Sequence, residues 1–280
     1  MKIRINGEDA DIQLETEKTV GDILSALEAW LVGKGHRLSG LGVDGQPVDA
    51  SSVARCFDIG IDEVGTLDIY TSSVAALFSE CLVSLRDAVD EYEASGFGEK
   101  ASVAALWNES PAAKMLESED PGLADWAGKT FSGEGSGPAV LRTVVEERMR
   151  ELREPDAEMD RISGLVADVC ARLEELPLDV QTGKDARAAE TVSLFSGIAE
   201  KVLRIYGILG RDGFHDEAAK VGELPMSDYV AEFHSALSEL LNAYEQNDSV
   251  LVGDIAEYEI SPRLRGLHAA VSDAAKVTYQ

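Results

Sequence analysis

The chain has 280 residues, and 45% of them are hydrophobic, so it can bury a large core and is not disordered throughout. Its 52 acidic residues against 25 basic ones give a formal net charge of -27. Such a field repels phosphate backbones and anionic lipids, so we expect neither nucleic acid nor a membrane as a partner. We expect another protein with a basic or apolar face, although acidity by itself also fits a plain role in solubility.

Targeting and redox signals are weak in this sequence. The first eight residues are not followed by the apolar core of a signal peptide, and no run of about 18 apolar residues predicts a membrane helix. The three cysteines, Cys56, Cys81 and Cys170, are scattered and have no paired metal-binding spacing. We expect them to be buried, reduced thiols in a cytoplasmic protein.

Residues 1–72 carry strand and turn signals that the rest of the chain lacks. Apolar and polar residues alternate over residues 2–6 and again over 10–15, and Asn6-Gly7 supplies a hairpin turn between the two predicted strands. Thr19 is the expected N-cap of a helix, and Asp22 favours its first turn. The predicted inward face of this helix consists of Val20, Ile23, Leu24, Leu27, Trp30 and Leu31.

Two more strand signals follow that helix. Residues 41–48 predict a strand, an Asp44-Gly45 turn and a short strand, and residues 64–71 predict a closing strand. The opening hairpin, the helix start at Thr19, the 43–48 turn and the 65–70 strand together resemble the ubiquitin-like β-grasp fold. The resemblance implies a protein-recognition surface. A conjugated modifier is not expected, because the sequence has no Gly-Gly pair and residues 72–74 continue into a helix.

From residue 73 onward the apolar period is close to 3.6, which predicts helices. Expected interruptions lie at Pro111, Pro121, Pro155 and Pro177, with a glycine-rich flexible stretch near 132–138. The last helix is expected to start near Val250 and to bend at Pro262. The predicted fold class is therefore α+β, with a β-grasp domain over 1–72 and a larger, acidic, antiparallel helical bundle over 73–280.

The usual catalytic and metal-binding patterns are missing from the sequence. There is no Gly-x-Ser-x-Gly, Cys-x-x-Cys or His-Glu-x-x-His, and the four histidines lack the Glu-x-x-His spacing of di-metal bundles. Cys81 and Cys170 fall on core-facing helix positions, where a thiol is usually inert. We therefore expect no enzyme activity and no cofactor or metal.

Two polar segments are candidate sites. Thr182, Gly183, Lys184 and Arg187 lie at the start of a predicted helix, which could hold an anion or could be an ordinary cap. The second segment, residues 254–263, is the densest polar cluster. In it Asp254, predicted to be partly buried, shares a helix face with Tyr258, while Arg263 can reach Glu259. This segment, with Glu257, could be a functional site or a polar network inside the bundle.

The leading hypothesis is a non-enzymatic cytoplasmic interaction protein, an adaptor or chaperone-like partner that uses a β-grasp head and an acidic bundle. One alternative is a bundle that binds a small ligand or cation at residues 254–263, with or without enzyme activity. Another is a self-associating structural subunit.

Overall fold

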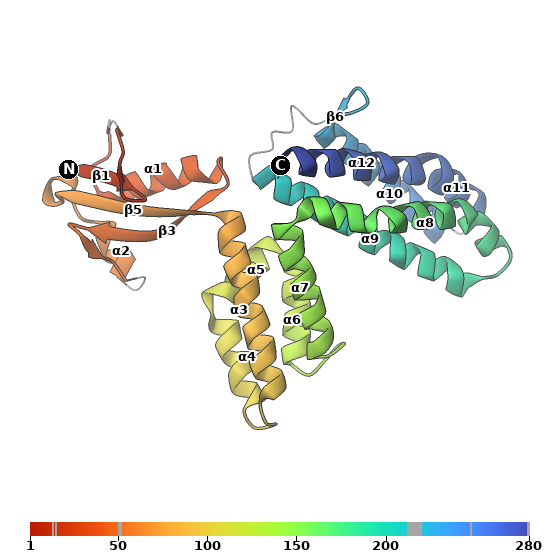
Figure 1. Cartoon of the computed structure of the whole chain (residues 1–280), viewed down its shortest axis with the longest axis horizontal. Coiled ribbons are helices and arrows are strands. Elements are labelled where there is room, and N and C mark those ends of the chain that lie inside the picture. Colours follow the sequence, from red (N-terminus) through yellow and green to blue (C-terminus); the bar gives the residue numbers. More distant parts are fainter. Residues whose placement is uncertain (13, 15, 50–51, 212–219, 247, 279–280) are drawn as a thin grey trace. The chain divides into compact units, whose positions relative to one another are not determined.

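The structure is a computed structural model that describes residues 1–12, 14, 16–49, 52–211, 220–246 and 248–278. The chain forms two compact units, Met1–Val145 and Glu146–Gln280. Figure 1 shows a small sheet at the start of the first unit, with helices making up most of the remaining chain. The α+β class is confirmed. The predicted domain boundary after residue 72 stays a prediction.

The sheet of the first unit is mixed and has the strand order β2-β1-β5-β3-β4. β1 runs parallel to β5, whereas the other three pairs are antiparallel. Its strands are β1 (Lys2–Ile5), β2 (Glu8–Asp9), β3 (His36–Val43), β4 (Gln46–Pro47) and β5 (Thr66–Ser73). Helix α1 (Val20–Val32) covers the sheet, and the short α2 (Val53–Cys56) and 3-10 helix η2 (Ile61–Glu63) precede β5.

Local signals in the sequence account for the turns and the helix start of this sheet. Asn6 and Asp44 adopt positive φ angles of 52° and 50°, and the glycine that follows each also has positive φ, as tight hairpins require. The Thr19 side chain accepts from the Asp22 amide, and Asp22 accepts from the Thr19 amide, which completes a capping box. These sequence predictions are confirmed.

Two predicted details are wrong, one in the sheet and one in the helix that covers it. The sequence predicts the return strand over residues 10–15, but the observed strand β2 covers only Glu8–Asp9. Pairing ends after the Ala10 amide donates to the Ile3 carbonyl (2.9 Å), because β1 begins one residue before Ile3. Residues 13 and 15 of that prediction lie outside the described ranges. Trp30, predicted to face inward, is 59% exposed because it stands at the edge of the apolar arc of α1.

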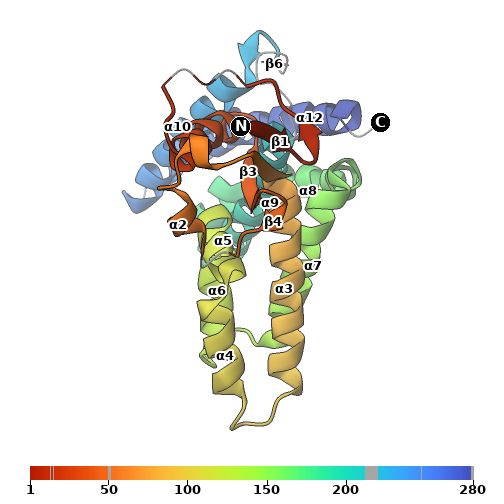
Figure 2. The ribbon, with the colours of Figure 1, turned by 90° about the vertical axis from the view of Figure 1, so that its left-hand side faces the viewer.

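The remaining helices of the first unit follow the predicted breaks. Ser73, Ser110 and Asp120 each accept an amide hydrogen bond as N-caps, and Pro111 and Pro121 begin their helices in the favourable first position. Figure 2 shows α3 running alongside the column formed by α4 to α6. The bounds are α3 (Val74–Ala94), α4 (Lys100–Glu109), α5 (Pro111–Glu119) and α6 (Pro121–Phe131). The glycine-rich stretch joins α6 to α7 (Pro138–Arg153), and Gly133, Gly135 and Gly137 have positive φ.

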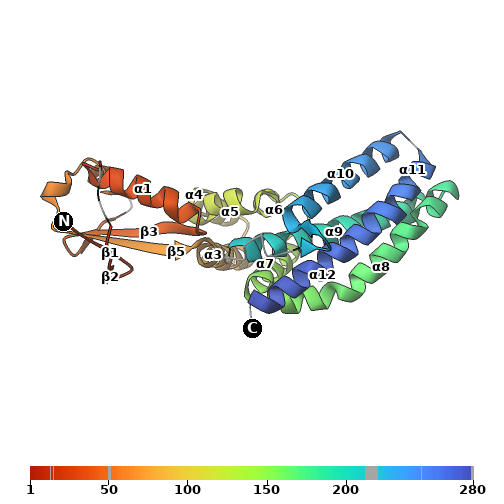
Figure 3. The same ribbon diagram turned by 90° about the horizontal axis from the view of Figure 1, so that it is seen from above.

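The second unit packs long helices around one apolar core (Figure 3). Its helices, after the C-terminal part of α7, are α8 (Pro155–Gln181), α9 (Asp185–Arg211), α10 (Met226–Glu245), α11 (Ser249–Asp254), the π-helix η3 (Ile255–Ile260) and α12 (Ser261–Thr278). Strands β6 (Lys220–Val221) and β7 (Leu224–Pro225) form a two-stranded ribbon. In the described ranges no helix is both long enough and apolar enough to cross a membrane.

Pro155 breaks the helix as predicted, since α8 begins there, but the other two prolines of this unit behave differently from the prediction. Pro177 lies inside α8, which continues to Gln181, and its ring packs against Gly253 in α11. Pro262 is the second residue of α12 and does not break it. The irregularity comes earlier, in η3, where the Ser261 amide donates to the Ala256 carbonyl five residues back.

Candidate functional site: an acid-rimmed groove on the first unit

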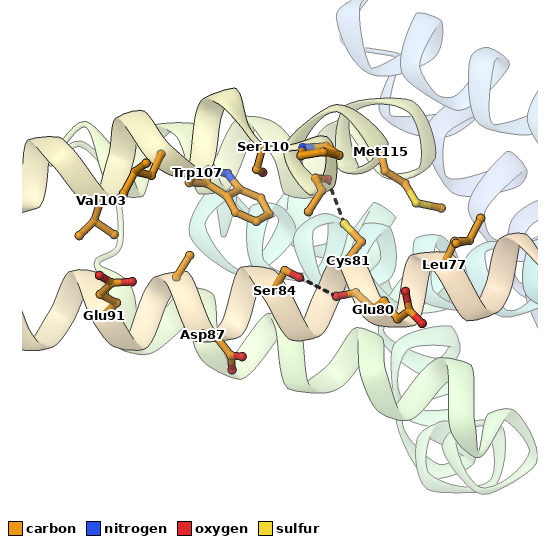
Figure 4. Close-up of a pocket in the computed structure, with 14 residues that line it drawn as sticks. Leu77, Glu80, Cys81, Ser84, Asp87, Glu91, Val103, Trp107, Ser110 and Met115 are labelled. Atoms are coloured by element: carbon orange, nitrogen blue, oxygen red, sulfur yellow. Dashed lines mark hydrogen bonds between the residues drawn. The ribbon is translucent and has the colours of Figure 1, made fainter. Parts of the chain in front are cut away.

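A groove with a volume of about 630 Å³ runs between α3 and the α4–α5 pair (Figure 4). Both sides of it come from helices that the sequence predicts. The lining residues from α3 are Leu77, Glu80, Cys81, Ser84, Asp87, Ala88 and Glu91. Those from α4, α5 and their junction are Val103, Leu106, Trp107, Ser110, Pro111, Ala112 and Met115.

The groove is held open by packing beneath it. The Cys81 thiol of α3 donates to the Ala112 carbonyl of α5 at 3.1 Å. Trp107 is only 7% exposed, and its ring lies 6.1 Å from that of Phe131, which in turn meets Tyr92 of α3 edge to face at 5.2 Å. These contacts join α3, α4, α5 and α6 below the groove, so its two sides are fixed relative to each other.

The two sides differ in chemistry. The α3 side carries three carboxylates, whereas the α4–α5 side carries no charged residue. On the α4–α5 side Leu106 is 68% exposed, which leaves a large apolar side chain in water beside the groove. In Figure 4, Val103 and Trp107 point from the α4 side toward α3, and Glu91 points back toward them. We call these sides the acidic wall and the apolar wall.

The carboxylates of the acidic wall are only partly neutralised. Asp87 pairs with Arg86 at 2.8 Å, and both side chains are partly exposed. Glu80 and Glu91 form no ion pair with a basic side chain in the described part of the chain. Burial raises the pKa of the Cys81 thiol to about 11, so at neutral pH it is protonated and is not a nucleophile. The described lining of the groove therefore contains no activated thiol.

The polar segment predicted at residues 254–263 is a surface feature. Asp254, predicted to be partly buried, is exposed, because the residues of η3 that face the core are Ile255, Ala256 and Ile260. Arg263 does pair with Glu259 as predicted, and it also lies 3.5 Å from Glu232 of α10.

Tyr258, also in that segment, is 64% exposed, and a hydrogen bond and charge repulsion from Glu257 raise its pKa. No group of three metal-ligating side chains occurs among the residues that the structure describes.

The predicted anion site at the start of α9 is already occupied by carboxylates of the chain itself. Lys184 Nζ lies 3.4 Å from Asp179 Oδ1, and Arg187 Nε lies 3.2 Å from Asp179 Oδ2. Arg187 also pairs with Glu175. Thr182 caps the C-terminal end of α8, where its hydroxyl donates to the Leu178 carbonyl at 2.7 Å. An external anion would have to displace the buried Asp179.

A buried charge cluster in the second unit was missed at the sequence level. Lys201 Nζ of α9 lies 2.6 Å from Glu147 Oε1 and 2.7 Å from Glu158 Oε2, and the Lys201 and Glu158 side chains are 9% and 1% exposed. Burial by itself would raise the pKa of Glu147, but the hydrogen bond and attraction of Lys201 lower it. Glu151, also 1% exposed, accepts from Arg204 at 3.0 and 3.2 Å. Every charge has a partner, which fits a structural role.

The relative and the two family models that match this chain carry no description of activity. Residues 1–73 match the family described as the TP0873 N-terminal domain, and residues 158–270 match the Domain of unknown function (DUF8042). A protein of Treponema pallidum (strain Nichols), described as an uncharacterized protein, is 24% identical over 267 residues, or 95% of this chain and 94% of the relative. No solved structure is detectably similar. No catalytic family is indicated, and the similarity to the relative extends over both compact units.

Proposed function

We propose that this chain is a non-enzymatic interaction protein, an adaptor or chaperone-like partner, whose groove on the first unit binds a segment of another protein. The observation that carries the proposal is the pairing of an open apolar wall with a wall of carboxylates. An exposed apolar surface bordered by charge is typical of protein-binding sites.

The surroundings of the groove support binding over catalysis. Catalytic sites bring together a nucleophile, a base and groups that stabilise developing charge. In this groove the thiol is kept protonated by burial, and the carboxylates stand along an exposed helix face. Covering the exposed Leu106 side chain would stabilise a complex, because burying a leucine contributes about 1.5–3 kcal/mol.

The sheet of the first unit provides a second recognition element in this proposal. The strand order β2-β1-β5-β3-β4, with β1 parallel to β5 and α1 packed on the sheet, supports the β-grasp assignment made from the sequence. An apolar cavity of about 360 Å³ between the sheet and α1 is bordered by Trp30 and Ile12. The three buried, unbridged cysteines support a reducing, cytoplasmic setting.

The test is capture of partners from a lysate by the full chain in three forms. Leu106→Asp places a charge on the apolar wall, and Leu165→Asp makes the same change at an exposed leucine (54%) of α8, in the second unit. A specific protein retained by the wild type and by Leu165→Asp but lost from Leu106→Asp supports the proposal. If that protein binds Leu106→Asp as well as it binds the wild type, the groove is not the binding site.

A further inference from the structure

We infer that the segment bound in the groove is a basic amphipathic helix of about four turns, with its cations spaced to match the carboxylates of α3. This inference rests on the proposed function and specifies the chemistry of the partner. It follows from the length of the groove, the spacing of charges on the acidic wall and the position of the apolar wall.

The length of the groove is set by α3. Its lining residues extend from Leu77 to Glu91, which corresponds to about 21 Å along a helix axis. A partner helix of about 14 residues covers the same length. Both walls are helices whose backbone groups bond within the helix, so they offer no strand edge to which an extended peptide could add. The groove therefore favours an occupant that is itself a helix and binds through its side chains.

The groove-lining residues of α3 repeat at spacings of three and four. Leu77, Glu80, Ser84, Asp87 and Glu91 follow that pattern, which places them in one row along the helix. Within this row the carboxylates are separated by seven and then four residues, or about 10 and 6 Å. A helix packed lengthwise beside α3 can match them with basic residues at the same two spacings. Antiparallel packing reverses the order of the spacings.

Charge complementarity selects a basic partner over a neutral one. Residues 73–145 contain 12 acidic and 5 basic side chains, so the surroundings of the groove are negative as well as its rim. Glu80 and Glu91 have no basic partner in the described part of the chain and are available for pairing. A basic segment would be attracted over a long range and then held in register by these carboxylates.

The apolar wall defines the second stripe of the partner. Leu106 and Met115 belong to the apolar wall, whereas the carboxylates belong to the α3 side. A bound helix must therefore present apolar side chains on the face adjoining its basic row. Residues next to one another in a helix are separated by about 100°, so each basic residue should adjoin a large apolar one in the partner sequence. The expected motif is a basic–apolar pair repeated at spacings of four and seven residues.

The direct test uses two synthetic peptides of equal composition, about 18 residues long and blocked at both ends. The matched peptide has lysines at spacings of four and seven, each beside a leucine; the shifted peptide moves the lysines by two residues, to the opposite face. Binding of each labelled peptide to the full chain is measured by fluorescence anisotropy at low salt. We expect the matched peptide to bind at least ten-fold more tightly. Equal binding of the two peptides would overturn the inference.

Two charge-reversal variants of the protein locate the binding. Glu80→Lys/Asp87→Lys/Glu91→Lys reverses the acidic wall, and the control Glu99→Lys/Glu109→Lys/Glu117→Lys makes the same change in net charge at exposed residues outside the groove lining. The first variant should bind the matched peptide about ten-fold more weakly than the wild type does, as expected for the loss of three exposed ion pairs. A peptide with glutamates in place of the lysines should restore binding to this variant. An equal effect of the control would mean that net charge alone attracts the peptide.

These outcomes separate the inference from the proposed function. If a protein partner depends on Leu106 but neither peptide binds, the groove is a protein site and the basic-helix chemistry is wrong. If Leu106→Asp still captures the protein partner while the matched peptide binds at the acidic wall, the proposed function is wrong. The peptide then recognises a charged surface that is not the natural partner site. Far-ultraviolet circular dichroism of each variant checks that the total helix content is unchanged.

Discussion

The contact between Gly253 and Pro177 gives the sharpest stability prediction. A Cβ atom added at Gly253 would lie 2.4 Å from Pro177 Cγ and 2.8 Å from Pro177 Cβ, closer than real Cβ contacts. The proline ring is covalently tied to the backbone of α8 and cannot rotate away. Gly253→Ala therefore requires α11 and α8 to move apart in a buried region of the second unit.

The expected cost combines two opposing effects. Overpacking a core by one methyl group costs about 1–3 kcal/mol, and a contact of 2.4 Å to a rigid ring belongs in the upper part of that range. Alanine is favoured over glycine inside a helix by about 0.5–1 kcal/mol. The net expectation is a loss of about 1–2 kcal/mol in the free energy of unfolding. The control is Gly164→Ala in α8, an exposed position with nothing within 4 Å of the added Cβ, which should gain about 0.5–1 kcal/mol.

The assay is urea unfolding of the full chain, followed by circular dichroism at 222 nm, with the transition midpoints of the two variants compared. A midpoint for Gly253→Ala that equals or exceeds that of the wild type would refute the packing argument. Pro177→Ala, combined with Gly253→Ala, removes the Cγ contact and should recover part of the loss. A double variant as unstable as the single one would show that the penalty has another source.

Three further predictions concern the ion pairs of Lys201 and Lys276, the reactivity of the Cys81 thiol and the helix cap at Asp22. Lys201→Met leaves Glu158 buried beside fewer cations and should lower the free energy of unfolding by about 3 kcal/mol. Lys276→Met breaks only an exposed pair with Asp160 and should lower it by less than about 1 kcal/mol. Urea unfolding measures both changes. Because burial raises the pKa of Cys81 to about 11, a thiol reagent at pH 8 should label it only after unfolding, read by mass spectrometry; rapid labelling of the native chain would contradict this. Backbone amides of Lys18 and Thr19 lower the pKa of Asp22, so wild type should exceed Asp22→Asn in stability near neutral pH, and the difference should disappear as the pH falls through the lowered pKa.

Much of the first unit could be predicted because its signals are local. Asn6-Gly7 and Asp44-Gly45 adopt the positive φ angles that their side chains tolerate, whatever packs around them. The Thr19 capping box and the prolines at 111 and 121 act within one helical turn. The apolar stripe from Phe78 to Tyr92 is buried as its period predicts.

Which residues at the margin of an apolar helix stripe are exposed was harder to predict. Periodicity shows the direction in which the stripe faces, but it does not show how far the buried region extends to each side. Trp30 falls at the margin of the α1 stripe and is largely exposed. Leu106 adjoins the buried Trp107 in the sequence, and nothing in the local pattern shows that one lies in water and the other in the core. The groove depends on that difference, so its acidic and apolar walls become visible only when α3 is placed beside α4 and α5.

By itself the sequence determined the fold class, the hairpin turns, most helix boundaries and the negative field, all of which depend on neighbouring residues or on composition. Tertiary structure decided the features that join distant residues. Asp179 holds Lys184 and Arg187 in what was predicted as an anion site, and Lys201 reaches a carboxylate 43 positions away. Long charged side chains take partners from whichever element packs next to them, and one sequence does not specify which element that is.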